Sequence, residues 1–451
     1  MTMVNQVAQA MQTVLTTAAE QAARDSGFCQ RRSKLGGAAF AQTLVFAHLS
    51  HPSATLEDLA QTAAATGVTA KPQAFDQRFT PQAADYLQRV LAATVEQVVA
   101  ADPVVLPLLC QFQGVYLEDS TTVALPDALR DHWPGCGGGN AAAAGTQAAI
   151  KFQVRLDCCT GRLDGPWPSA ATVPDQRSAL PTDDLPAGAL RIADLGYFSL
   201  DVFQRLQQRG VYWLTRWQPG TDLYTATGQK LSLATYFTKQ TATVIDVPVR
   251  LGATHRLPCR LVAFRVPKPV AAKRRRRLLK KAQKKGRAPS STALALCDWN
   301  VFLTTVPTSR AGAAAISVLA RLRWQIELLF KLWKSDAHVA EVRSSKPWRV
   351  LCEVLAKLIG AVLQHWLLLV SCWQYPARSL RKAAKAVRGM ALALAATLHD
   401  LAALERCIAV IERCLRVAAR INKRRQQPHS YQLLQYPTLY GQGASKQRKA
   451  A

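Results

Sequence analysis

The chain has 451 residues, of which 49% are hydrophobic and 19% charged, which argues against a largely disordered protein and allows about two to four folded domains. Its 57 Lys and Arg residues exceed its 29 Asp and Glu residues, giving a formal net charge of +28. Because such an excess repels itself in the folded state, we expect a polyanionic partner. Nucleic acid is the commonest such partner, and membrane surfaces and ribosomal assemblies are the alternatives.

Eleven cysteines are scattered without a Cys-x-x-Cys pair, which indicates reduced thiols in the cytoplasm rather than a zinc site or a disulfide framework. Residues 358–373 are apolar enough to suggest a membrane span. The stretch is short for a bilayer, however, and has Gln364 and His365 near its middle. We therefore expect a buried helix and no membrane partner.

Residues 1–110 are predicted to form a helical, DNA-binding N-terminal region. Within it, one expected helix covers residues 55–67 and ends at Gly67, and a second follows over residues 72–79. This arrangement is equally compatible with a DNA-binding helix-turn-helix and with an ordinary helical hairpin.

Residues 111–216 are predicted to form an α/β unit, because β-branched and aromatic runs alternate with turn signals. We expect a helix over residues 200–208, a Gly/Ala loop over 137–145 and a short strand after the turn at Thr160 and Gly161. The other expected strands cover residues 114–124, 149–157, 190–194 and 211–215. Strands, a helix and a strand within about a hundred residues indicate a mixed α/β sheet.

Residues 217–305 show broken strand signals and are predicted to be β-rich. In their middle, residues 268–287 contain no acidic residue and include a continuous basic run, namely Lys273, Arg274, Arg275, Arg276 and Arg277. Two interpretations stay open, a solvated flexible loop and a DNA-contacting arm, and a mobile basic loop can be both.

The remainder of the chain is predicted to be helical. We expect a helix within residues 306–345, a C-terminal helical region over 346–430 and a basic, disordered tail over 431–451.

Two aspartates stand out in the α/β region. Asp119 lies inside the first strand, where burial of an unpaired carboxylate is costly unless a cation binds; the alternative is an edge-strand residue that faces water. Its neighbour Glu118 points to the other face of the sheet. Asp194 ends an apolar strand, and the carboxyl ends of strands are where α/β folds place ligands. The alternative is a turn or N-cap aspartate before Gly196.

Glu327 is the third acidic residue of interest, in a helix predicted over residues 317–334. Arg323, Glu327, Lys331 and Lys334 follow one another at intervals of four, four and three residues and share a face separate from the apolar stripe. The alternative is a set of ion pairs on an exposed helix. The basic excess on this face favours an anionic partner.

These residues together resemble the DDE transposases of bacterial insertion sequences, in the subgroup marked by a Tyr-x2-Arg-x3-Glu-x6-Lys signature. The match is Arg323-Trp-Gln-Ile-Glu327 with Lys334 seven residues on, while the signature tyrosine falls on Ala320. Three further stretches are similar to family motifs: Asp119-Ser-Thr121, the Asp-Leu-Gly-Tyr-Phe stretch at 194–198 with the strand ending in Leu214-Thr-Arg216, and the strand from Trp299 to Pro307. The resemblance covers roughly residues 30 to 425.

The resemblance implies an RNase H-like core, formed by residues 111–216 and 306–345 and interrupted by the β-rich insertion domain 217–305. Asp119, Asp194 and Glu327 would bind two Mg²⁺ (or Mn²⁺) ions that clamp an in-line phosphoryl displacement. Trp299 would stack on a flipped base if cleavage proceeds through a DNA hairpin; a strand-core tryptophan is the alternative. The other implied DNA contacts are Arg323, Lys331, Lys334, Arg216 and the run Lys273 to Arg277.

The implied activity is cleavage and strand transfer of insertion-sequence ends in the bacterial cytoplasm. The partners would be the double-stranded inverted-repeat ends, target DNA and a second copy of the chain in a synaptic dimer. Ala320 keeps open one alternative, a catalytically inactive, transposase-derived DNA-binding protein. A metal nuclease that hydrolyses DNA without strand transfer would use the same three carboxylates.

Overall fold

The computed structural model describes residues 2–31, 33–137, 147–341, 344–375, 377–421 and 430–437. The chain forms two compact units. Unit 1 contains Met1–Val104, Asp119–Leu180 and Gln325–Lys423, and unit 2 contains Val105–Glu118, Pro181–Trp324 and Arg424–Ala451. Strand β1 (Val115–Leu125) and helix α11 (Ala313–Lys331) are each divided between the two units.

Unit 1 is mainly helical. Its helices are α1 (Met3–Thr13), α2 (Ala19–Asp25), α3 (Gly37–Ser50), α4 (Leu56–Ala65), α5 (Pro72–Asp76), α6 (Pro81–Glu96), α12 (Pro347–Leu369), α13 (Leu380–Arg388), α14 (Ala391–Thr397) and α15 (Leu401–Val417). Local sequence sets several starts: Thr55 and Asp58 form a capping box on α4, and Thr80 caps α6 ahead of Pro81. Gly67, at φ +84°, follows the end of α4 in a conformation that favours glycine.

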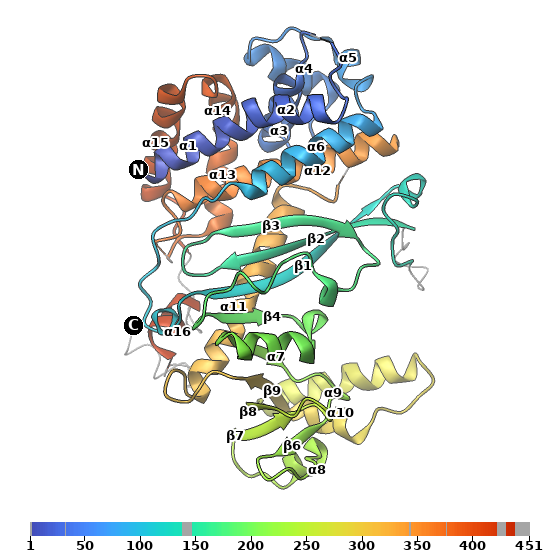
Figure 1. The fold of residues 1–451 in the computed structure, drawn as a ribbon, viewed down its shortest axis with the longest axis vertical. Helices are drawn as coiled ribbons and strands as arrows, with labels where there is room; N and C mark the ends of the chain where they lie inside the picture. The colour runs from blue at the N-terminus through green and yellow to red at the C-terminus, as the bar shows by residue number, and fades with distance from the viewer. Residues whose placement is uncertain are drawn as a thin grey trace. The chain divides into compact units, whose positions relative to one another are not determined.

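Helix α12 is the core of unit 1 and packs against α3 and α6 (Figure 1). It is long and apolar enough to cross a membrane, but its apolar stretch is entirely buried within the protein. The buried helix predicted around residues 358–373 is therefore confirmed. Gln364 donates to the carbonyl of Ala384 and His365 bonds with the carbonyl of Gly161, which satisfies one polar group of each side chain in this apolar setting.

The sheet of unit 1 contains β2 (Ala148–Asp157), β3 (Leu163–Ala170) and the second half of β1, in the order β3-β2-β1. Strands β2 and β3 are antiparallel, with a register shift between Gln153 and Arg155. All ten residues of β2 are buried, and α6 packs against β3.

The sheet of unit 2 continues through the first half of β1 in the order β1-β4-β5-β9-β8-β7-β6. Its strands are β4 (Leu190–Ala193), β5 (Tyr212–Arg216), β6 (Leu223–Thr225), β7 (Val244–Leu251), β8 (Leu257–Arg265) and β9 (Trp299–Thr304). The pairs β1–β4 and β4–β5 are parallel and the remaining pairs are antiparallel. The sheet thus has nine strands among the described residues, and it is mixed, as the sequence predicts.

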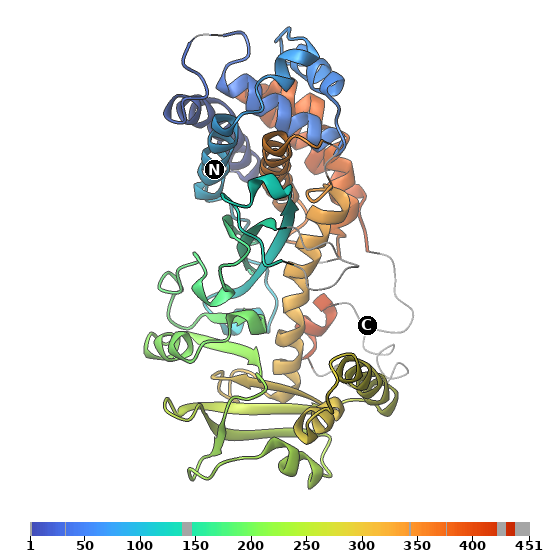
Figure 2. The same cartoon turned by 90° about the vertical axis from the view of Figure 1, so that its right-hand side faces the viewer.

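The remaining helices of unit 2 are α7 (Leu200–Gln208), α8 (Leu233–Thr238), α9 (Lys268–Gln283), α10 (Ser291–Ala295) and α16 (Ser430–Gln435). Helix α7 connects the parallel strands β4 and β5, and its Phe203 stacks on Trp213 of β5 with ring centroids 4.4 Å apart. Figure 2 shows the strands of this unit from a second side.

Two predictions need correction. The flexible loop considered for the basic segment 268–287 is wrong, since the segment is helical over Lys268–Gln283 and its Lys, Arg, Leu and Ala residues are strong helix formers; the DNA contact stays a prediction. The tail expected to be disordered over 431–451 contains most of α16, Ser430–Gln435, while residues 438–451 lie outside the described residues. Most of the predicted Gly/Ala loop, residues 138–146, also lies outside them.

Candidate active site

Asp194 lies at the carboxyl end of β4, whose four residues are all buried, and it begins the short turn Leu195–Tyr197. Its side chain is 40% exposed. Its Oδ1 atom is 3.6 Å from Nη1 of Arg323 on α11 and 3.9 Å from Nη2 of Arg216 at the end of β5. Three residues predicted separately from two strands and a distant helix therefore meet within unit 2. These distances are those of ion pairs rather than hydrogen bonds.

A buried ion pair joins β1, which contains Asp119, to β4, which ends directly before Asp194. Arg191 Nε donates to Glu118 Oε2 at 2.7 Å, and the two side chains are only 4% and 1% exposed. The parallel register pairs Tyr116 with Arg191 and Glu118 with Ala193. The fully buried carboxylate of β1 is thus Glu118 rather than Asp119, which is half-buried.

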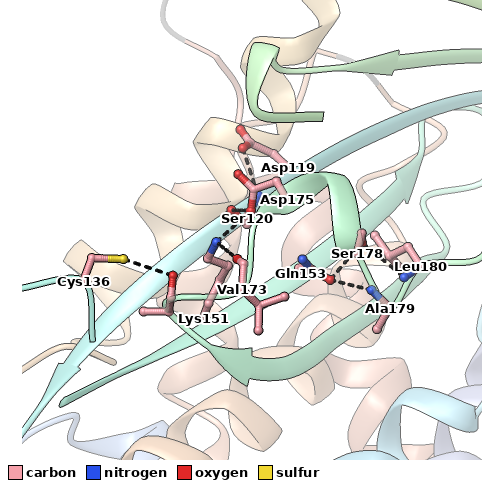
Figure 3. Close-up of polar contacts among 11 residues, drawn as sticks. Asp119, Ser120, Cys136, Lys151, Gln153, Val173, Asp175, Ser178, Ala179 and Leu180 are labelled. Atoms are coloured by element: carbon pink, nitrogen blue, oxygen red, sulfur yellow. Dashed lines mark hydrogen bonds and ion pairs between the residues drawn. The ribbon is translucent and has the colours of Figure 1, made fainter. Parts of the chain in front are cut away.

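Asp119 follows the part of β1 that pairs with β4, and it belongs to a polar network in unit 1 (Figure 3). Its Oδ1 atom accepts from the backbone N–H of Ser120 at 2.8 Å. The Ser120 hydroxyl donates to Asp175 Oδ1 at 2.9 Å, and Lys151 Nζ donates to the same oxygen at 3.0 Å. Lys151 also donates to the carbonyl of Val173 at 2.6 Å, and its side chain is 11% exposed.

Asp175 and Lys151 were missed by the sequence analysis. A lysine inside the apolar strand 149–157 is a usable signal, since a buried ammonium needs a partner. Asp175 lies in an irregular Pro- and Asp-containing stretch that gives no such signal.

Glu327 lies on α11, whose predicted apolar stripe is buried as expected. The buried residues of α11 include Leu319, Leu322, Ile326, Leu329 and Phe330, and Trp333 in the turn that follows is also buried. Glu327 is half-buried and Lys331 is exposed. Lys334 lies in a π-helical turn, Leu332–Asp336, so its position relative to Glu327 does not follow from α-helical spacing. Burial lowers the pKa of Lys334 from its usual value.

The two tryptophans of interest differ in exposure. Trp299, predicted to stack on a base, is 4% exposed; its ring lies 4.9 Å from Phe237 in a stacked arrangement, and the guanidinium of Arg265 is 4.6 Å from the ring centre. This position matches the strand-core alternative, so a stacking role for Trp299 stays a prediction that requires its neighbours to move. Trp324, which the sequence analysis did not select, is 55% exposed on α11, next to Arg323.

The five basic residues of the predicted arm do not all face solvent. Lys273, Arg276 and Arg277 are exposed, whereas Arg274 and Arg275 are half-buried. The two half-buried arginines contact residues 298–300.

The predicted catalytic triad draws on both units: Asp119 and Glu327 belong to unit 1, and Asp194 belongs to unit 2. Among the described residues, no group of three or more His, Cys, Asp or Glu side chains could hold a metal ion. The convergence of the three carboxylates therefore stays a prediction. Their chemistry fits a hard divalent cation, because carboxylate oxygens are the ligands that Mg²⁺ and Mn²⁺ prefer.

The chain has a mixed sheet, with one aspartate on β1, a second after β4 and a glutamate on the later helix α11. Comparison with known proteins shows which class of protein has this arrangement. The family described as "Transposase DDE domain" matches residues 112–363, more than half of the chain. The chain therefore belongs to this family. It is a DNA transposase, an enzyme that cleaves and transfers DNA strands with divalent metal ions, and the predicted RNase H-like α/β fold is confirmed.

Individual relatives are transposases of bacterial mobile elements. The chain is 26% identical, over 76% of both chains, to the transposase for insertion sequence element IS231F of Bacillus thuringiensis subsp. israelensis. It is 24% identical, over 77% of both chains, to the transposase for insertion sequence element IS1151 of Clostridium perfringens. A putative transposase InsL for insertion sequence element IS186A of Escherichia coli is 30% identical over 39% of this chain and 50% of the relative.

Proposed function

We propose that this transposase cleaves and joins the ends of a bacterial insertion sequence, with Asp119, Asp194 and Glu327 as the ligands of two Mg²⁺ or Mn²⁺ ions. The observation that carries the proposal is the 3.6 Å contact between Asp194 and Arg323. It links the end of β4 to α11, the helix that presents Glu327 one turn after Arg323.

Bound divalent ions would supply stabilisation of the attacking and leaving oxygens in an in-line displacement. The chain's own residues would bind and orient the DNA. The guanidinium groups of Arg216 and Arg323 are planar forks suited to phosphate oxygens, and their place beside Asp194 would hold a phosphate next to that carboxylate. The exposed ammonium of Lys331 and the half-buried one of Lys334 would add point charges.

The exposed indole of Trp324 offers a face on which a DNA base could stack. Its neighbour Arg323 would contact the backbone, and stacking on an aromatic side chain contributes about 1–3 kcal/mol per base. Trp324 is a better-placed stacking residue than the buried Trp299, since its ring does not have to leave a packed core first.

The DNA partners would be the double-stranded inverted-repeat ends and the target, in the bacterial cytoplasm. Support comes from the relatives, which are transposases for insertion sequence elements. Bringing two ends together would require a homodimer in a synaptic complex. The helices α4 and α5, separated by a turn at Gly67, are the N-terminal segment proposed to recognise an end.

The test is nicking of a labelled duplex that carries an insertion-sequence end, with Mg²⁺, by the wild type and by Asp119→Asn, Asp194→Asn and Glu327→Gln. Each variant should lose nicking by more than about 100-fold, because even changes outside the ligand shell cost about 10–100-fold. Each should keep DNA binding. Nicking that survives any of the three substitutions contradicts the assignment of that residue.

Two alternatives appear as distinct outcomes of the same assay. A wild-type protein that binds the end but never nicks it, with either metal, is the inactive DNA-binding protein that Ala320 keeps open. Nicked ends without any joined donor–target product indicate a nuclease rather than a transposase.

A further inference from the structure

Helix α9 concentrates positive charge on one short element. From Lys268 to Arg287 the chain contains eleven Lys and Arg residues and no Asp or Glu. Like charges spaced four residues apart destabilise a helix, so the segment needs contacts outside itself in order to stay folded. The helix is nevertheless continuous over Lys268–Gln283.

Two arginines supply those contacts by fixing one face of α9 to residues 298–300, at the junction of the turn Leu296–Asp298 and β9. Arg274 donates from Nη1 to the carbonyl of Trp299 at 3.2 Å and from Nη2 to Oδ1 of Asn300 at 2.7 Å. Arg275 forms an ion pair with the carboxylate of Asp298. Ala271 and Ala282 are buried on the same side. The orientation of the helix about its own axis is therefore set by specific bonds.

From Lys273 onward, the opposite face carries only basic side chains that reach solvent; nearer the start of α9, Pro269 and Val270 are exposed on the same side. At about 100° per residue its members lie within an arc of about 140°, and they extend for about 16 Å along the helix. They are Lys273, Arg276, Arg277, Lys280, Lys281 and Lys284, all exposed. We call this set the α9 basic face (for the position of α9, see Figure 1).

We propose that the α9 basic face binds the phosphate backbone of double-stranded DNA on a rigid helix, independently of base sequence. The proposal rests on the transposase function for the nature of the polyanion. A duplex carries one negative charge per about 1.7 Å, so about 16 Å of it offers about nine phosphates, enough to neutralise all six cations. Ordinary solvated surfaces intersperse both signs of charge, and this face does not.

The experiment measures binding of the full chain to a duplex of unrelated sequence, by fluorescence anisotropy over a range of salt concentrations and without divalent metal. Each lost phosphate contact reduces the slope of log K against log salt by about 0.9. The triple variant Lys273→Gln, Arg276→Gln, Arg277→Gln should therefore reduce the slope by about 2.7.

The matched control removes three exposed cations of unit 2 that lie outside α9, in the variant Arg205→Gln, Lys239→Gln, Arg250→Gln. This control should change the slope by less than about 0.9, the value of a single contact. An equal fall in both triple variants would mean that net charge alone matters. If the slope of the α9 triple variant falls by less than about 0.9, the α9 basic face does not contact DNA. Either result overturns the proposal.

Two further arms separate the remaining explanations. The variant Arg274→Gln, Arg275→Gln should increase proteolysis of α9 while reducing the slope by less than one contact, because those arginines hold the helix and do not face the DNA. If the α9 triple variant loses binding to phosphatidylserine vesicles but keeps the wild-type DNA slope, the face binds a membrane and the proposal fails. Because the experiment measures binding and not nicking, failure of the catalytic proposal would leave its result unchanged, and the two proposals fail separately.

Discussion

The carboxylate of Asp119 is held by its local surroundings. The chain of contacts from Lys151 through Asp175 to Ser120 ends at the backbone N–H that binds Asp119 (Figure 3). Lys151 and Asp175 have side chains only 11% and 23% exposed, so their ion pair is less screened by water than one on the surface. We infer that Asp175 acts as a positioning residue for Asp119.

Asp175→Asn should weaken this network, because it removes the negative charge but keeps a side-chain oxygen that can accept hydrogen bonds. Loss of the charge leaves Lys151 with the Val173 carbonyl and a neutral acceptor, at a cost of about 1–3 kcal/mol in the free energy of unfolding, measured with urea. The Mg²⁺ concentration needed for half-maximal nicking should rise by about 10-fold or more. Asp164→Asn, in a partly exposed pair with Arg155 on the same sheet, is the control. Equal metal requirements for both variants and the wild type would contradict the inferred role.

At the residue scale, the sequence predicted the buried apolar stripe of α11, but it did not predict which polar side chains are buried. The alternation of a strand places Glu118 and Asp119 on opposite faces, but it does not reveal which face is covered. Glu118 can be buried because it pairs with Arg191, which is 73 residues away in the sequence and so cannot be identified as its partner from local patterns. Likewise, the run Lys273 to Arg277 is uniform in sequence, and its division into anchoring and exposed side chains depends on Asp298 and Asn300.

At the scale of elements, the parallel register of β1 against β4 within unit 2 places Glu118 opposite Ala193. The Glu118–Arg191 pair joins these strands in the buried layer, and breaking one partner of a buried pair costs about 3–5 kcal/mol because it leaves an unpaired charge. Arg191→Met should therefore lower the free energy of unfolding by that amount, as measured by urea denaturation.

The double variant Glu118→Leu, Arg191→Met is the matched control for that change. It removes both charges together and should recover most of the stability lost in the single variant, since apolar replacements of buried pairs are often neutral. If the single variant is as stable as the wild type, the pair does not fix the strands.

The elements themselves were largely predictable because their signals are local. The expected strands at 114–124 and 149–157 agree with β1 and β2 within one residue, and the helix at 200–208 agrees with α7. The exceptions are α16, which lies in a tail predicted to be disordered, and α9, where a run of charge indicated a loop. The residues of α9 favour a helix, but the contacts with β9 and with η6, the turn Leu296–Asp298, that anchor the helix are not visible in the local sequence.

For the whole molecule, motif order predicted the family, and the family match over residues 112–363 confirms it. The order of motifs does not supply geometry. Asp194, Arg216 and Arg323 are shown together in unit 2, whereas the meeting of Asp119, Asp194 and Glu327 is proposed from the resemblance. That meeting is the central claim, since a transposase of this class needs a shared ligand set for its metal ions.

Electron paramagnetic resonance of Mn²⁺ bound to the full chain on an insertion-sequence end measures the shared site directly. We predict a spin-coupled pair of ions in the wild type. Asp119→Asn, Asp194→Asn and Glu327→Gln should each abolish the coupling and weaken Mn²⁺ binding by more than about 100-fold, more than changes outside the ligand shell cause. If any one of the three variants retains the wild-type spectrum and affinity, that residue is not a ligand and the three carboxylates do not form one site.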